Sequence, residues 1–303
     1  MNAAPALIGY AAVIGVVAPR GMLRSAWPHR APALAAAVWH ALSVSFAVSV
    51  ALAAFHLAAP TEHLHAGFVG ILHSCGVDVG PGRPNPNIAD RLAVALPAVV
   101  GLALAVSFAF HTLRARRERA RHRAILDVVG RRSAELRATV LVHSTPAAYC
   151  LPGRCPRIVV SEGALRLLSA EQLDAVLEHE RAHIVGRHHL VLAAVEAFAT
   201  VFRWVPLARH AREQTALLLE MVADDRALRR QSHDVLATAM YEMAAGRAPK
   251  GAFAASGHTV VVRLQRILGP RHEAHPALWG SVAAAALTVP VLPLLLACPP
   301  GLG

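Results

Sequence analysis

Charged residues are scarce in this chain of 303 residues. They make up 16% of it, whereas hydrophobic residues make up 55%, which excludes an ordinary soluble protein of this length. Lysine is nearly absent: Lys250 is the only one, so arginine carries almost all of the formal charge of +11. We attribute this bias to a GC-rich coding sequence. Since the chain also lacks an RNA-binding signature, we predict no direct nucleic-acid binding.

Cysteine is rare as well. The four cysteines are widely scattered and do not form a disulfide framework. Cys150 and Cys155 have no second pair of ligands nearby, so we expect reduced thiols and no structural zinc. Cys75 and Cys298 are both expected on the outer, oxidising side of a membrane. A bridge between them is chemically allowed there, and the sequence does not decide whether it forms.

Four uncharged apolar runs cover about residues 3–19, 33–59, 92–110 and 277–297. Each is long enough to cross a bilayer, so we predict four transmembrane helices. Pro290 and Pro293 should kink the last one. The first run lacks a basic segment before it, which argues against a cleaved signal peptide.

The arginines indicate how these helices are oriented. They cluster after the first span and over residues 114–123, whereas the loop over residues 60–91 has few. By the positive-inside rule, the N-terminus lies outside a cell-membrane protein, 60–91 is an outer loop, and 113–276 is cytoplasmic. We interpret the basic run as a stop signal next to anionic lipid rather than a nucleic-acid patch.

Residues 179–183 read His-Glu-Arg-Ala-His, an H-E-x-x-H motif. Ser169 and Gln172 form a capping box that predicts the start of a helix under it. Residues four apart share a helix face, so His179 and His183 can bind one Zn²⁺. Glu180 beside them can take a proton from the zinc-held water, whose pKa the metal lowers towards about 7. The motif therefore predicts a zinc metallopeptidase.

A catalytic zinc needs a third protein ligand, and His189 is one candidate. Together with Gly186 it fits the metzincin spacing, which requires the helix to end at that glycine. We predict instead an unbroken helix through His189, which would point this side chain away from the metal.

Glu220 is the candidate we favour. It lies between apolar neighbours in a helix predicted over residues 207–230, and metal ligation explains a buried acid there. Asp224, one turn later, can accept the free N–H of a ligating imidazole. The alternative is that both carboxylates pair with arginines such as Arg226.

The region 113–276 is large enough for a domain with its own core. We predict a strand over residues 138–142, a hairpin formed by 147–151 and 157–160, and helices elsewhere. A single crossing by the apolar segment 184–205 would separate the zinc motif from any later ligand. We therefore assign it to the core of the domain rather than to a fifth span.

The motif with the downstream E-x-x-A-D of residues 220–224 resembles a gluzincin, and most nearly the BlaR/MecR family of membrane zinc peptidases. The resemblance extends to the three leading spans, the hairpin, the segment 158–165 and the closing span. It implies His179, His183 and Glu220 as zinc ligands, Glu180 as the base, and a cytoplasmic domain that cleaves a winged-helix repressor. The antibiotic-sensing relatives carry a penicillin-binding domain after the last span, so we predict a short form without that sensor.

We thus predict a multi-pass α-helical membrane protein with an α+β, zincin-like metalloprotease domain between its third and fourth transmembrane helices. The predicted function is cleavage of a cytoplasmic protein, a repressor in signal-responsive gene regulation. The alternatives are an HtpX-like quality-control protease and a non-catalytic receptor with structural zinc. HtpX-like enzymes place spans between the zinc motif and the third ligand, which we do not predict here. Candidates for the oxyanion or substrate contact are Arg263, Tyr241 and His233.

Overall fold

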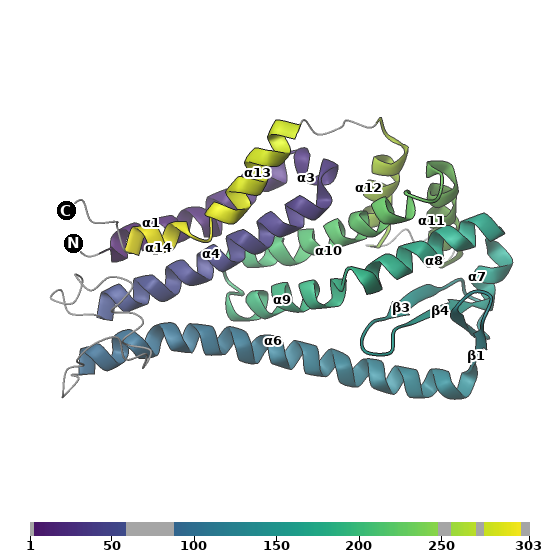
Figure 1. The fold of residues 1–303 in the computed structure, drawn as a ribbon, viewed down its shortest axis with the longest axis horizontal. Helices are drawn as coiled ribbons and strands as arrows, with labels where there is room; N and C mark the ends of the chain where they lie inside the picture. The colour runs from purple at the N-terminus through teal and green to yellow at the C-terminus, as the bar shows by residue number, and fades with distance from the viewer. Residues whose placement is uncertain (1–2, 59–87, 248–255, 271–275, 298–303) are drawn as a thin grey trace.

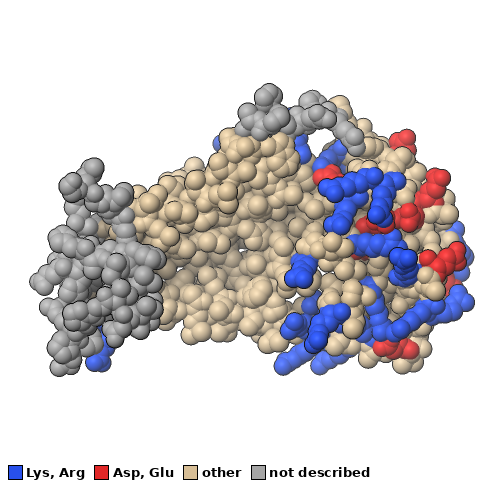
Figure 2. Space-filling view, viewed as in Figure 1, with Lys and Arg blue, Asp and Glu red and all other residues tan. Residues whose placement is uncertain are grey.

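The computed structural model describes residues 3–58, 88–247, 256–270 and 276–297. Most of the expected outer loop lies outside these residues, as do Cys75 and Cys298, so the question of their bridge lies outside them too. An apolar bundle of helices forms one end of the molecule and a mixed domain the other (Figure 1). The face drawn in Figure 2 shows arginine and acidic side chains gathered over the mixed domain, while the bundle is almost free of them.

Three helical segments in the described part are long and apolar enough to cross a membrane: Ala4–Arg24, Pro32–Ala58 and Arg91–Val129. The first consists of α1 (Ala4–Ala12), a π-helical turn (Val13–Val17) and α2 (Ala18–Arg24). A short helix, α3 (Trp27–Arg30), leads into α4 (Pro32–Ala58). The first three predicted spans therefore correspond to apolar helices.

The third of these helices is much longer than its predicted span. α6 (Ile88–Val129) has 42 residues and continues through the basic run into the mixed domain. No glycine or proline occurs between Gly101 and Gly130, so nothing in this sequence ends the helix earlier. The arginines of residues 114–123 thus extend the third span as a helix (Figure 1).

The fourth apolar run forms two helices, α13 (Pro276–Thr288) and α14 (Leu292–Ala297). Pro290 lies in the break, as the proline positions predicted. The break exposes the carbonyl of Val289, which accepts hydrogen bonds from the Tyr10 hydroxyl at 3.1 Å and the Ser45 hydroxyl at 2.8 Å. Side chains of two other apolar helices therefore satisfy the backbone at the break.

The sheet of the mixed domain has four strands in the order β1-β2-β4-β3. They are β1 (Gly130–Ser133), β2 (Ala138–Leu141), β3 (Ala148–Leu151) and β4 (Arg157–Ser161). β2 and β4 are parallel and the two outer pairs are antiparallel, which leaves β3 at one edge. The predicted strand and hairpin are confirmed, and β1 is an additional strand.

Helices cover this sheet. α7 (Glu162–Leu167) and α8 (Ala170–Val185) follow β4, and α11 (His233–Arg247) packs against α8. Ile158 and Val160 of β4 are buried with Val176 and Leu177 of α8 and Met243 of α11. This core fixes the zinc-motif helix α8 on the sheet.

Between these helices, α9 (His188–Val201) and α10 (Pro206–Ala227) form a hairpin that packs against the bundle. Phe198 of α9 meets Phe46 of α4 edge to face, with 6.1 Å between the ring centroids. The Ser107 hydroxyl of α6 donates to the Ala197 carbonyl at 3.3 Å. At the tip, Gly15 approaches so closely that a Cβ there would lie 3.1 Å from a methyl group of Val205.

This hairpin includes most of residues 184–205, which we assigned to the core of the domain rather than to a fifth span. Their apolar face packs against α4 and α6 of the bundle, beside candidate spans. A single membrane crossing by this segment would separate the zinc motif from Glu220. Instead, the chain turns back after α9, and α10 begins at Pro206. The hairpin returns the chain to the zinc motif, so Glu220 lies beside His179.

Candidate metal centre

α8 places the two histidines of the zinc motif on one face. Its capping box is confirmed. The Ser169 hydroxyl accepts a hydrogen bond from the backbone N–H of Gln172 at 3.2 Å, and the side-chain Oε1 of Gln172 accepts one from the backbone N–H of Ser169 at 2.8 Å. His179 is buried, and its Nε2 lies 3.1 Å from Nε2 of His183, one turn later. The helix thus brings two imidazole nitrogens to one point.

The helix under the motif ends sooner than predicted. α8 stops at Val185, and α9 starts at His188 after a bend of 57°. Arg187 adopts a left-handed conformation with φ of 50°, and a Cβ on Gly186 would lie 2.4 Å from the His188 ring. The prediction of an unbroken helix through His189 is therefore wrong, and glycine is required by the close contact.

His189 nevertheless stays away from the other two histidines. The charged groups that act on it are Arg116, Arg119 and Arg187, of which the first two belong to α6. The bend places α9 beside α6 instead of folding it back over His179 and His183. The metzincin arrangement thus fails because the chain bends towards the bundle.

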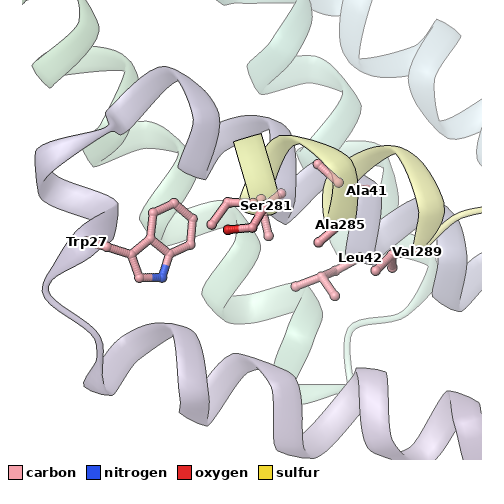
Figure 3. Close-up of a pocket in the computed structure, with 9 residues that line it drawn as sticks. Trp27, Ala41, Leu42, Ser281, Ala285 and Val289 are labelled. Atoms are coloured by element: carbon pink, nitrogen blue, oxygen red, sulfur yellow. The ribbon is translucent and has the colours of Figure 1, made fainter. Parts of the chain in front are cut away.

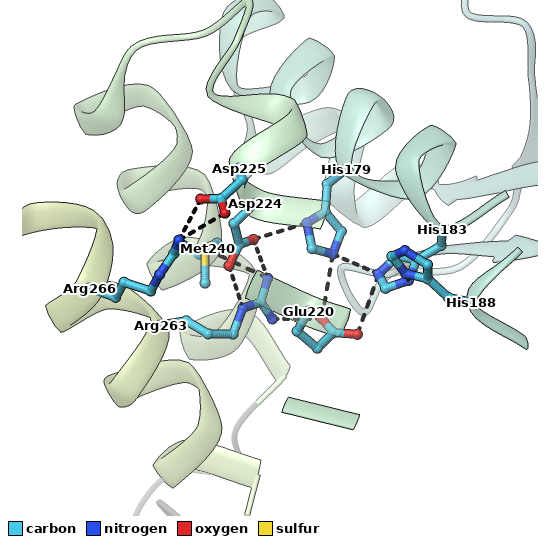
Figure 4. Close-up of polar contacts among 9 residues, drawn as sticks. All are labelled: His179, His183, His188, Glu220, Asp224, Asp225, Met240, Arg263 and Arg266. Carbon is cyan, nitrogen blue, oxygen red and sulfur yellow. Dashed lines mark hydrogen bonds and ion pairs between the residues drawn. The ribbon is translucent and has the colours of Figure 1, made fainter. Parts of the chain in front are cut away.

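Glu220 of α10 completes the cluster (Figure 4). Its Oε2 lies 3.4 Å from Nε2 of His179, and its Oε1 lies 3.3 Å from Nε2 of His183. Two donors about 2.05 Å from a tetrahedral ion are about 3.3 Å apart, so these separations suit Zn²⁺. In the described part of the chain, His179, His183 and Glu220 are the group of three that could hold a metal ion. Zinc is the cofactor of this site.

Asp224 and Arg263 contact the side chains of two of these ligands, His179 and Glu220 (Figure 4). Asp224 is fully buried, and its Oδ1 lies 3.0 Å from Nδ1 of His179. A proton on that Nδ1 leaves Nε2 free to face Glu220 and a metal. Arg263 of α12 (Ser256–Leu268) donates to both oxygens of Asp224, at 2.8 and 2.6 Å, and to Oε2 of Glu220 at 2.8 Å.

These contacts keep both carboxylates ionised. Burial alone would raise the pKa of Asp224, but Arg263 and His179 hold it at about 2. Burial also opposes ionisation of Glu220, and His179 together with Arg263 lowers its pKa to about 2. The alternative interpretation named arginines such as Arg226 as partners of these carboxylates. The arginine that pairs with both is Arg263, and this pairing occurs together with the geometry of a metal site.

Of the three oxyanion candidates, the cluster in Figure 4 includes only Arg263. Its guanidinium faces the two carboxylates, so its first role is to orient them. Tyr241 of α11 is 60% exposed, and His233 is the first residue of the same helix. Arg263 is therefore the candidate with contacts to both carboxylates.

His188 is a contact that the sequence did not reveal. It is buried, and its Nδ1 lies 2.8 Å from Nδ1 of His183. One ring must donate to the other, so this contact orients His183 as Asp224 orients His179. No local pattern signals this role, because it depends on the left-handed turn at Arg187.

Glu180 lies next to Cys150 of the edge strand β3 and within range of the charges of His179 and Glu220. The backbone N–H and the thiol of Cys150 both act on the Glu180 carboxylate, and burial raises the pKa of that carboxylate. Burial, with the charge of Glu180, raises the pKa of the Cys150 thiol to about 12. The general base predicted from the motif is therefore close both to two of the ligands and to the edge of the sheet.

Cys150 should react slowly with thiol reagents. A thiol with a pKa of about 12 is almost fully protonated at pH 8, so alkylation should be about three orders of magnitude slower than for an ordinary exposed thiol. Mass spectrometry after timed iodoacetamide treatment, with Cys75 and Cys298 changed to serine, measures this rate. Cys155 is exposed and serves as the internal control. Equal rates at the two cysteines would contradict the proposed surroundings of Cys150.

A second arginine of α12 ties this end of α10 to the bundle. Arg266 donates to both oxygens of Asp225, at 2.7 and 2.8 Å, and to the carbonyl of His29 at 2.6 Å. His29 belongs to α3, in the connection between the first two apolar helices. Arg263 and Arg266 thus hold neighbouring carboxylates of α10, one behind the metal site and one beside the bundle.

Arg266→Gln should lower the stability of this junction by about 1–2 kcal/mol, because Asp225 is partly exposed and keeps some solvation. The melting temperature of the detergent-solubilised protein, followed through zinc release, measures the change. Gln265→Ala, on the exposed side of the same helix, is the matched control and should have almost no effect. Indistinguishable melting of the two variants would show that the contact contributes nothing.

Residues 113–223 match the model of peptidase family M48. The match covers the end of α6, the sheet, α7, α8, the hairpin and Glu220, so it includes all three ligands and Glu180. No curated protein and no solved structure matches the chain. The BlaR/MecR resemblance is therefore supported only as far as a membrane zinc metallopeptidase of family M48.

Proposed function

Because this chain is a membrane zinc metallopeptidase with an M48 domain over residues 113–223, we propose that it cleaves protein chains at the cytoplasmic surface of the membrane. The observation that carries this proposal is the cluster of His179, His183 and Glu220 beside an unpaired sheet edge. Glu180 is close to both and supplies a base. A purely structural zinc site has no use for that base.

Zn²⁺ bound at this site would polarise a peptide carbonyl and acidify a water molecule. Glu180 then accepts the proton of the attacking water and delivers it to the departing amine. Burial favours the protonated form of Glu180, which suits the second of these steps. Asp224 and His188 keep the two imidazoles in the orientation that this requires.

The edge strand β3 offers a place for the substrate backbone. Among the described residues β3 pairs with β4 alone. Apart from the Cys150 N–H, which acts on Glu180, the groups of its other edge can bind an extended peptide. Cys150, the third residue of β3, is next to Glu180. A peptide added along β3 would thus pass close to the base and to the ligands.

The position of the site favours substrates near the bilayer. The apolar part of α6 ends at about Leu113, and His189, at the start of α9, is influenced by Arg116 and Arg119 just beyond it. The zinc motif directly precedes α9, so its ligands lie close to this boundary. The family resemblance predicts a winged-helix repressor as the substrate. The α9–α10 hairpin packs against two candidate spans, which favours substrates that are themselves membrane proteins. Cytoplasmic segments of membrane proteins are therefore the second candidate substrate, as in the quality-control alternative.

The experiment compares new protein N-termini in cells that express the wild type with those in cells that express Glu180→Gln. New termini should appear only with the wild type. A cleaved soluble repressor supports the first candidate, and cleaved juxtamembrane segments support the second. Termini confined to outer domains would contradict the proposed side of the membrane, and none at all would contradict the proposed activity.

The orientation can be measured directly. In a background without native cysteines, a cysteine at Asn85 should react with an impermeant thiol reagent added outside intact cells, because the arginine distribution places that loop outside. A cysteine at Ser232, between α10 and α11, should react only after the cells are permeabilised. The reverse pattern would place the peptidase domain outside.

A further inference from the structure

An apolar cleft lies between α4 and α13, in the bundle (Figure 3). Its volume is about 350 Å³, and Trp27 lies at one end of it. Val38, Ala41 and Leu42 of α4 form one wall, three positions at helical spacing. The facing wall is a stripe of α13 and the residue after it: Ser281, Val282, Ala285, Ala286 and Val289.

The dimensions of the cleft select its occupant. The stripe from Ser281 to Val289 extends over about 12 Å, close to the half-thickness of a bilayer core, about 15 Å. A volume of about 350 Å³ over that length gives a groove roughly 9 Å across, once the radius of a water molecule is added on each side. An α-helix with side chains needs about 10–12 Å, so a transmembrane segment does not fit. A single hydrocarbon chain does.

Two arginines flank Trp27, the residue at one end of the cleft, in the sequence. Trp27 lies three residues after Arg24 and three before Arg30, and both arginines are exposed. Neither is within ion-pair distance of a carboxylate among the described residues. Tryptophan and arginine are typical of the level of lipid headgroups, where arginine attracts anionic phosphates.

We propose that this cleft binds one anionic phospholipid, with an acyl chain between α4 and α13 and its phosphate beside Arg24 and Arg30. The lipid would bridge two elements next to the Arg266 contact, since α3 accepts from Arg266 and α13 follows α12. A bound lipid therefore stabilises the packing of α13, in addition to any role of the zinc site.

The test uses the full-length protein in detergent, analysed by native mass spectrometry with phosphatidylglycerol and phosphatidylcholine of identical chains. The wild type should retain one phosphatidylglycerol molecule and prefer it over phosphatidylcholine. Each arginine contributes about 1 kcal/mol, so Arg24→Gln and Arg30→Gln should each lower the preference roughly fivefold. Glycerol phosphate, a headgroup without chains, should not displace the lipid.

Ala285→Trp should abolish lipid retention, because the indole fills the cleft, and Ala41→Phe should do the same from the other wall. Ala284→Trp, on the exposed side of the same helix, is the matched control and should retain the lipid. Normal zinc content shows that each variant is folded. Lipid retention by Ala285→Trp and Ala41→Phe, or equal binding of the two lipids by the wild type, would overturn the proposal.

Discussion

Glu180→Gln should abolish peptide hydrolysis while the protein keeps nearly all of its zinc. The side chain is outside the group of three ligands, so its replacement leaves the donor set unchanged. General bases typically contribute 10²–10⁴-fold to the rate, and the glutamine has no proton acceptor of comparable strength. The measurement pairs zinc content by mass spectrometry with turnover of an unstructured protein substrate, both on purified protein.

Glu171→Gln is the matched control for this result. It lies in the first turn of the same helix α8, is exposed, and removes one negative charge far from the ligands. It should leave both zinc content and hydrolysis close to the wild-type values. If Glu180→Gln with full zinc content retained activity, the role of this carboxylate as the base would be refuted.

The parts that local sequence patterns predicted are those whose cause is local. The capping box at Ser169 and Gln172 fixes the start of α8, and the spacing of His179 and His183 fixes their common face. The β3–β4 hairpin follows from two apolar strands around Pro152 and Gly153. In each case the residues that determine the structure are within a few positions of it.

The parts that the sequence did not predict depend on contacts between distant residues. Arg263 is 39 positions from Asp224, and nothing near either residue indicates that they pair. The contact of His188 with His183 requires the left-handed conformation of Arg187. Residues other than glycine adopt this conformation rarely, and no local motif specifies it here. These residues support the ligands, so a search for ligands alone could not find them.

Hydropathy predicted which segments are apolar but not what they pack against. The segment 184–205 was assigned to the core of the domain rather than to a span. In the structure, α9 and α10 pack as a hairpin on α4 and α6. An apolar face looks the same in a sequence whether it covers a sheet or a bundle. The polar side chains Ser107 and His111 of α6 reach Ala197 and Thr200 of α9, and such pairs appear only in the structure.

Glu220→Ala should lower zinc affinity far more than any change at His189. Glu220 supplies an oxygen to the group of three, held by Arg263 at 2.8 Å, whereas His189 belongs to a helix that bends towards α6. Asp224→Ala should have an intermediate effect of about 10–100-fold, because Asp224 acts through the Nδ1 of His179. The zinc content of the purified variants after dialysis against a weak chelator measures this order.

The bend at Gly186 makes this comparison more discriminating than the sequence suggested. A helix that ends at that glycine is the feature that a metzincin needs, and it is present here. What decides between the two ligands is therefore the direction of the chain after Arg187, not the presence of a break. If His189→Ala lost the metal while Glu220→Ala kept it, α9 would have to turn over the site. It would then have to leave Ser107 and His111 of α6, and the hairpin against the bundle could not exist as described.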